Sequence, residues 1–131
     1  MKRLITHAPQ EVIQAALIWR RGAGFTFRRI VNVMDARGIL VSHTTVSRWD
    51  KEQKDRGFVC SPDIHRVCEF RNVRLYGREV CMYTAVNYFD ENIDFIFTVN
   101  PNRQEAERFF RLSMVSEWLM GNTNQSRSGK E

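Results

Sequence analysis

The sequence predicts an α+β fold, in which an N-terminal three-helix helix-turn-helix unit is followed by a three-stranded antiparallel β-meander and a further helix. Apolar residues recur at helical spacing through the first 57 residues, whereas from about residue 65 they partly alternate as in strands. The net charge of +5 is also unevenly distributed. Residues 1–57 contain 11 Lys and Arg against 5 Asp and Glu, and residues 58–131 contain 9 against 10. The excess positive charge lies in the helical half, which favours a nucleic-acid-binding segment there.

The composition excludes several classes of protein. Apolar residues make up 43% and charged residues 27% of the chain, which is typical of a folded soluble domain rather than a disordered one. The longest uninterrupted apolar run covers only residues 15–19, far short of the roughly 20 residues that a membrane span requires. No apolar stretch follows the basic N-terminal residues as in a secretory signal. We therefore expect a cytoplasmic protein with no membrane partner.

Local signals place the first two helices. Pro9 opens the first one, where its missing N–H costs nothing, and the glycines within residues 22–24 end it. Thr26 is a good cap for the second helix, in which four apolar residues follow the i, i+3, i+4, i+7 rule. Arg37 and Gly38 mark the end of this helix, because a cation in the last turn followed by glycine is a typical C-terminal signature.

The third helix carries the functional prediction. Ser42 can cap a helix from about His43 to Lys54, with Val46 and Trp49 facing inward. Two helices joined by a short turn, the second beginning with small polar residues, describe a helix-turn-helix, whose second helix meets base edges in the major groove. We therefore expect residues 1–57 to bind double-stranded DNA. The alternative is a small three-helix bundle with a solvated basic face.

The predicted DNA contacts follow from residue chemistry. Lysine and arginine neutralise phosphates and fix the register, whereas hydroxyl and guanidinium groups can also reach base edges. The predicted phosphate contacts are Arg20, Arg21, Arg28 and Arg29, with Lys51 and Lys54 against the DNA backbone. The predicted base contacts are Thr44, Thr45, Ser47 and Arg48, and His43 lies on or near the same exposed side.

The second half of the chain predicts three strands. They cover residues 65–75, 79–86 and 93–99, with a turn at residues 76–78 and a polar connection at residues 87–92. Connections this short favour an antiparallel meander.

A helix follows the strands and completes the predicted organisation. Asn102 and Glu105 provide a capping box, and the apolar residues after them can cover the sheet. The last eleven residues contain nothing to bury and predict a disordered tail. The predicted units are a helix-turn-helix domain at 1–57, a linker at 58–64, a second domain at 65–120 and the tail at 121–131.

The three cysteines, Cys60, Cys68 and Cys81, are an odd number, and without a signal peptide we expect them to be reduced. Together with His65 they could ligate zinc, but no Cys-x-x-Cys pair is present. Buried thiols on strands are the preferred interpretation, since a free cysteine behaves as a small hydrophobe. We predict neither a metal site nor a cofactor.

In their order and spacing, several segments resemble the bacterial DDE transposases of the insertion-sequence-six group. Residues 25–39 and 41–49 are similar to the second helix, turn and recognition helix of that family. Residues 83–86, 93–95 and 106–111 are similar to its second strand, third strand and first catalytic-domain helix. The resemblance implies that residues 65–120 are the truncated beginning, β-β-β-α, of an RNase H-like catalytic domain.

The resemblance fails at the catalytic residues. The first catalytic Asp of the family lies on the first strand, where this sequence places either Cys68 or Glu69, depending on how the segments are aligned. The other two catalytic carboxylates would come beyond residue 131. Two-metal phosphoryl transfer needs carboxylates from several strands, and a thiol is a poor ligand for Mg²⁺. We therefore expect no catalytic residues and no enzymatic activity, but a transposase-derived, regulatory DNA-binding protein of bacterial or mobile-element origin.

Two alternatives remain open at this point. One is an interaction or inhibitor protein, in which the remnant catalytic half has become a binding surface. The other is a decaying gene fragment with no selected role. A sheet of only three strands would also present an open edge, so we expect a homodimer or a bound protein partner that pairs with it.

Overall fold

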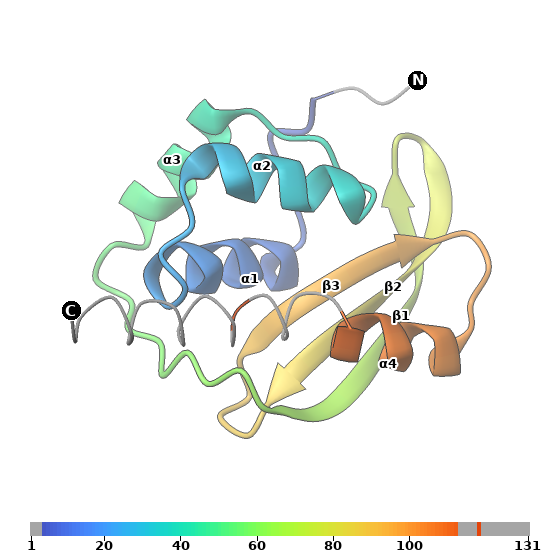
Figure 1. Cartoon of the computed structure of the whole chain (residues 1–131). Helices are drawn as coiled ribbons and strands as arrows, with labels where there is room; N and C mark the ends of the chain where they lie inside the picture. The colour runs from blue at the N-terminus through green and yellow to red at the C-terminus, as the bar shows by residue number, and fades with distance from the viewer. Residues whose placement is uncertain (1–3, 113–117, 119–131) are drawn as a thin grey trace.

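The computed structural model describes residues 4–112 and Trp118, and it confirms the predicted α+β class and the order of its elements (Figure 1). Three helices come first: α1 (Gln10–Arg21), α2 (Phe27–Ala36) and α3 (His43–Glu52). They are followed by β1 (Ile64–Leu75), β2 (Arg78–Asn87), β3 (Asn92–Thr98) and α4 (Arg103–Leu112). The strands form an antiparallel sheet in the order β1-β2-β3, as expected for a meander. The predicted tail, residues 121–131, lies outside the described residues.

The predicted caps are confirmed. The hydroxyl of Thr26 accepts from the backbone N–H of Arg29 at 3.1 Å, and that of Ser42 accepts from Thr45 at the same distance. The side-chain oxygen of Asn102 likewise accepts from the N–H of Glu105. Each cap satisfies a backbone donor that the first turn of a helix leaves without a partner.

The turn between β1 and β2 is also where the sequence places it. Tyr76 and Gly77 both have positive φ, 55° and 74°, as a two-residue hairpin turn of the twist-matching type requires. β1 itself is irregular, because the register shifts between Phe70 and Val73, and Asn72 between them has a φ of 60°. These are the features of a β-bulge, which bends the strand and interrupts its edge.

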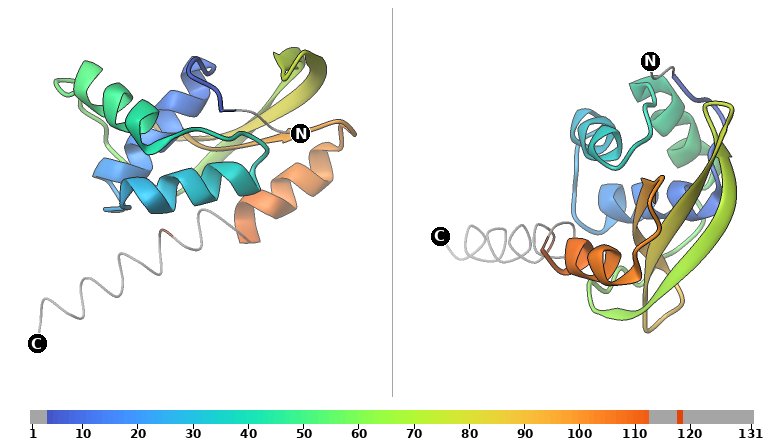
Figure 2. Two further views of the ribbon diagram at one scale, coloured as in Figure 1. Left: turned by 90° about the horizontal axis from the view of Figure 1, so that it is seen from above. Right: turned by 90° about the vertical axis from the view of Figure 1, so that its right-hand side faces the viewer.

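The two faces of the sheet are covered by different helices. Thr84 and Phe95 are register partners on one face, and the indole of Trp19 from α1 stacks on Phe95 with centroids 5.7 Å apart. Since side chains alternate along a strand, the neighbouring Tyr83 lies on the other face. There it lines a small cavity together with Phe109 of α4. Figures 1 and 2 show α1 to α3 grouped beside β3, with α4 lying across the strands.

The helical and β-rich halves share one hydrophobic core. The indole N–H of the fully buried Trp19 donates to the carbonyl oxygen of Ile93 at 2.8 Å. The guanidinium of Arg37, at the end of α2, forms an ion pair of 2.6 Å with Asp94 of β3, and both side chains are at most 3% exposed. The core is therefore continuous across residues 58–64, and the division into separate domains there stays a prediction.

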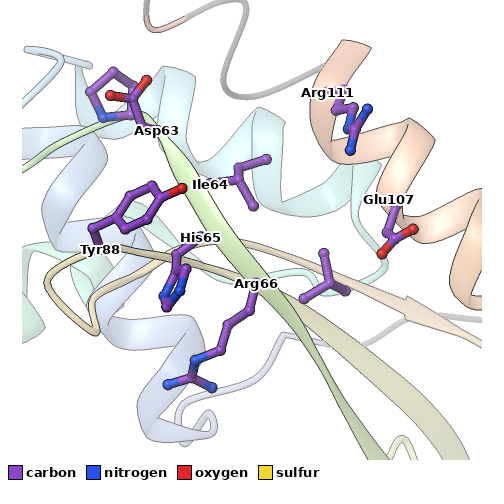
Figure 3. A pocket seen from close by; sticks show the side chains of 9 residues that line it. Asp63, Ile64, His65, Arg66, Tyr88, Glu107 and Arg111 are labelled. Carbon is purple, nitrogen blue, oxygen red and sulfur yellow. The ribbon is translucent and has the colours of Figure 1, made fainter.

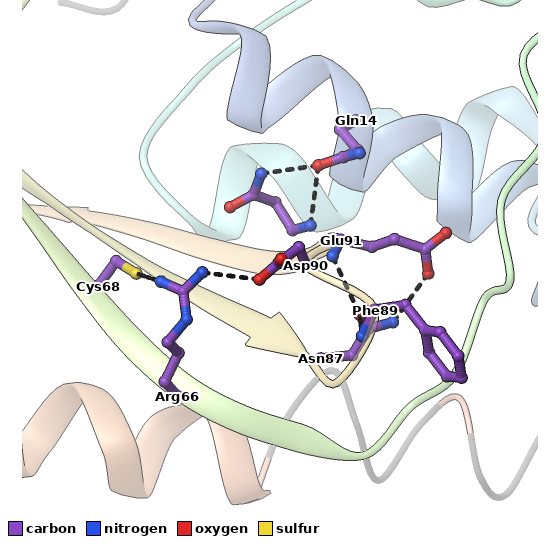
Figure 4. Close-up of polar contacts among 8 residues, drawn as sticks. Gln14, Arg66, Cys68, Asn87, Phe89, Asp90 and Glu91 are labelled. Atoms are coloured by element: carbon purple, nitrogen blue, oxygen red, sulfur yellow. Dashed lines mark hydrogen bonds and ion pairs between the residues drawn. The ribbon is translucent and has the colours of Figure 1, made fainter.

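The segment between the halves is held by a buried carboxylate. Glu91, 7% exposed, accepts from the backbone N–H groups of Val59 at 2.6 Å and Cys60 at 3.0 Å. It also accepts from the amide group of Asn87 at 2.8 Å (Figure 4). Two hydrogen bonds to this one side chain thus fix the segment to the β2–β3 turn, and Asn87 holds the carboxylate in place.

The two edges of the sheet differ. At β3, the side chain of Gln14 accepts from the backbone N–H of Asn92 at 2.8 Å, and the N–H of Phe97 donates to the carbonyl of Arg37 at 3.1 Å. α1 and the α2–α3 connection therefore cover the outer edge of β3. At β1, within the described part of the chain, no backbone of another segment pairs with the outer edge, although Arg103 donates to one of its carbonyls. The open edge that the strand count predicts is accordingly β1.

Candidate nucleic-acid interface

α3 presents a polar side and an apolar side. Val46 and Trp49 are at most 2% exposed and pack into the core, as predicted. Thr44, Arg48 and Lys51 follow one another at i, i+4 and i+7 and are exposed, as the helical period requires for residues on one stripe. His43 is exposed at the start of the helix and Ser47 is half-buried, whereas Lys54 is exposed in the turn beyond the end of α3.

The expectation that Thr45 lies on the exposed side is wrong. Its side chain is only 5% exposed, and its hydroxyl lies 3.1 Å from that of Ser42. Thr45 directly precedes the core residue Val46 and stands four residues before Trp49, so the helical period turns it inward. It supports the cap of α3 and is not available to a base edge.

Arg20 and Arg21 are also engaged within the protein. Arg21 makes an ion pair of 2.9 Å with Asp50 and donates to the carbonyls of Asp50 and Arg56. These contacts fix the end of α3 against α1. Arg20 donates to the carbonyl of Phe25 at 3.0 Å, and its guanidinium lies over the ring of Phe27. The two arginines therefore brace the helices around the predicted interface.

The two arginines of α2 are more exposed than Arg20 and Arg21. Arg28 and Arg29 lie in the first turn of α2 and are exposed. The guanidinium of Arg29 lies 4.1 Å from the ring centroid of Phe25. This is a cation–π contact, in which the positive charge is attracted to the face of the aromatic ring. Both lie at the N-terminal end of a helix, where the helix dipole adds to their positive potential.

The connection between α2 and α3 joins the two helices and also covers the end of β3. It runs over residues 37–42, which is longer than the three to four residues of a common helix-turn-helix turn. Gly38 has a φ of 103°, and a Cβ at this position would meet the Cβ of Phe97 at 3.2 Å. The connection is longer because it also covers the end of β3.

Arg37 is a structural residue that the sequence did not single out beyond its role as a helix-ending cation. Its guanidinium binds Asp94 and the carbonyl of Val33, and it lies 5.5 Å from the ring centroid of Trp19 and 5.0 Å from that of Phe109. Asp94 is 57 positions away in the chain, so no local sequence pattern predicts this ion pair.

Glu69, one of the two residues that the transposase resemblance aligns with a catalytic Asp, lies in a polar cluster on the α4 side of the sheet. The carboxylate of Glu69 is 2.9 Å from the guanidinium of Arg71 and 3.2 Å from the hydroxyl of Tyr83. Burial, together with Cys81 and Glu69, raises the pKa of Tyr83 to about 12. Burial and Glu69 also raise the pKa of the Cys81 thiol. This cluster therefore keeps its phenol and thiol protonated at neutral pH.

The cysteines lie in separate surroundings. Cys68 accepts from the guanidinium of Arg66 at 2.8 Å, and Arg66 also binds Asp90 (Figure 4). Burial, followed by the charge of Glu91, raises the pKa of the Cys60 thiol. Within residues 4–112 and Trp118, no three His, Cys, Asp or Glu side chains come together where a metal ion could be held.

A cavity of about 600 Å³ opens between the start of β1 and α4 (Figure 3). The rings of His65 and Tyr88 stack beside it with centroids 4.4 Å apart, and Glu107 and Arg111 line its other side. None of the lining residues comes from α1, α2 or α3, so this cavity is not part of the helical interface.

Among the described residues, no helix is long and apolar enough to cross a membrane. Comparison with protein-family models, with curated proteins and with solved structures finds no match for the chain.

Proposed function

We propose that the chain binds double-stranded DNA, with α3 in the major groove. The observation that carries this proposal is the exposed side of α3. The polar side chains of His43 and Thr44 are exposed in its first turn, and the basic side chain of Lys51 is exposed in its last turn. The opposite side is fixed in the core by Val46 and Trp49, so this helix is held rigidly by the rest of the fold. Such a side is the arrangement with which a recognition helix reads base edges and neutralises phosphates.

The structure supports fewer phosphate contacts than the sequence predicts. Arg28 and Arg29 are exposed in the first turn of α2, and Lys51 and Lys54 at the far end of the interface are exposed as well. Arg20 and Arg21 would act indirectly, by holding α1 against α2 and α3. Each remaining cation that neutralises a phosphate releases a counterion, which makes binding dependent on salt.

The transposase origin and the lack of enzymatic activity also belong to this proposal. The order of the segments supports descent from a bacterial or mobile-element transposase. On this proposal the protein acts at the nucleoid and needs no cofactor. At the position where that family carries its first catalytic Asp, Cys68 and Glu69 both have protein partners, Arg66 and Arg71. A regulatory role as a DNA-binding protein is the function that remains.

A salt titration tests the proposal. We expect the affinity for a random duplex to fall linearly with salt on logarithmic axes, with a slope of about 0.9 for each phosphate contact. Lys51→Ala should lower that slope by about 1, because it removes one such contact. Thr44→Ala should instead weaken a preferred sequence more than random DNA. Fluorescence anisotropy with a labelled duplex measures both effects.

The control for charge alone is Arg78→Ala, since Arg78 is exposed in β2, away from α3. This variant should retain the wild-type slope. Absence of binding even at low salt, or an equal loss for Lys51→Ala and Arg78→Ala, would contradict the proposal.

A protein-interaction or inhibitor role is the second candidate, and the outer edge of β1 favours it. In the described structure this edge has unpaired backbone groups, while the edge of β3 is covered. A second copy of the chain or another protein would add a strand there. Light scattering after gel filtration, followed over a range of concentrations, distinguishes the 15.5 kDa monomer from a dimer. A monomer with no co-purifying protein would count against this role.

A further inference from the structure

The segment before α1 is fixed beside α3. The backbone N–H of Ile5 donates to the carbonyl of Leu40, in the α2–α3 connection, at 2.9 Å. The side chain of Ile5 is half-buried against the core, whereas Thr6 and His7 are exposed. Figure 2 shows this N-terminal segment and α3 at the same end of the molecule. Residues 4–7 therefore form an arm with a defined position next to the proposed recognition helix.

Arg48 connects this arm to α3. Its guanidinium donates to the carbonyl of Thr6 at 2.6 Å, and its Nε lies 3.8 Å from the carboxylate of Glu52. Two of the three guanidinium nitrogens thus face oxygens of the protein. The side chain is still 43% exposed, so the contact lies at the surface of the interface and not in the core. An arginine held in this way is placed to orient the arm.

We propose that residues 4–7 form a second contact with the DNA, beside the groove that α3 enters, and that Arg48 is a positioning residue for this arm. The proposal rests on the proposed function. The hydroxyl of Thr6 and the imidazole of His7 are donors suited to phosphate oxygens and to acceptors in the minor groove. Short N-terminal arms that follow the groove adjacent to a recognition helix are an established way to extend a binding site.

A double-mutant cycle tests the proposal. We expect the Thr6→Ala/His7→Ala variant to bind duplex DNA about tenfold more weakly, as the loss of two hydrogen bonds predicts. Arg48→Ala should show a similar loss, and the triple variant should lose no more than either, because both changes disable the same contact. Lys51→Ala is the matched control, since its effect should multiply with that of the arm variant. Both arm side chains are exposed, so thermal unfolding should stay close to that of the wild type.

Hydroxyl-radical footprinting gives an independent readout. The arm variant and Arg48→Ala should both shorten the protected region at one end, whereas Lys51→Ala should leave its length unchanged. Wild-type affinity for the arm variant, or multiplying losses for Arg48→Ala and the arm variant, would overturn the proposal while leaving the proposed function intact. Absence of duplex binding by the wild type would overturn the proposed function, and the arm contact with it.

Discussion

Asp94→Asn is expected to lower the free energy of unfolding by about 3–5 kcal/mol, the usual cost of removing one partner from a buried ion pair. The side chains of Asp94 and Arg37 are at most 3% exposed, and the Oδ1 of Asp94 lies 2.6 Å from the Nε of Arg37. An amide in place of the carboxylate removes the negative charge of Asp94 from beside the buried guanidinium. The amide oxygen can still accept from the N–H of Phe95, which binds Asp94 at 2.7 Å, so the effect reports mainly on the ion pair.

The matched control is the same substitution at an exposed pair. Asp90 binds Arg66 at 2.9 Å, but the two side chains are 81% and 49% exposed. Asp90→Asn should therefore cost at most about 1 kcal/mol, and asparagine tolerates the positive φ of this position. Urea denaturation measures both variants. Equal losses for the two would show that the buried pair does not join α2 to β3 as described.

Glu91→Ala is expected to lower the free energy of unfolding by about 3 kcal/mol, because it leaves three donors without their acceptor. The donors are the backbone N–H groups of Val59 and Cys60 and the side-chain amide of Asn87. Since two of them belong to the connecting segment, the amides of Val59 and Cys60 should also exchange faster with deuterium. Urea denaturation and hydrogen exchange measure the two consequences.

Glu79→Ala serves as the control for this prediction. Glu79 is an exposed glutamate of β2, and its removal should change the free energy of unfolding by no more than about 0.5 kcal/mol. Glu91→Gln, which keeps one acceptor oxygen, should fall between the two. Unchanged protection of the Val59 and Cys60 amides in Glu91→Ala would show that this carboxylate does not hold the segment.

The parts of the fold that the sequence predicts are those with local causes. The caps at Thr26, Ser42 and Asn102 depend on a hydrogen bond three residues along the chain, and the turn at Gly77 depends on its own backbone angle. The end of α3 shows the limit of such signals, because the predicted helix reaches Lys54 and the observed one ends at Glu52. Helix ends are set by weak terminal hydrogen bonds, for which a shift of two residues is common.

The parts that the sequence does not predict depend on distant residues. Arg37 resembles any cation at the end of a helix until β3 brings Asp94 to it. Arg21 resembles a phosphate contact until α3 and the turn after it place Asp50 and two carbonyls around it. Arginine makes five N–H donors available, and whether they meet protein or solvent is decided by tertiary packing. The exposed polar side chains of α3 remain available for the predicted interface. The predicted positions whose side chains contact other parts of the protein do not.

These contacts join the proposed DNA-binding helices to the sheet. α1 packs against β3 through Trp19, and the α2–α3 connection covers the same strand through Gly38. Because α3 and the sheet share a single core, destabilising the sheet should also disrupt the position of the exposed side of α3. DNA binding would then be lost as well. Binding and stability measurements on Asp94→Asn should accordingly change together.

Chemical-shift mapping of a ¹⁵N-labelled sample with a short duplex at low salt directly tests whether α3 binds DNA. We expect the shift changes to concentrate on the amides of α3, from His43 to Lys51, and on the first turn of α2. They should diminish as salt is added, because phosphate contacts are screened and counterions compete for them. Changes confined to β1 and α4, or no changes at all at low salt, would contradict DNA binding by α3.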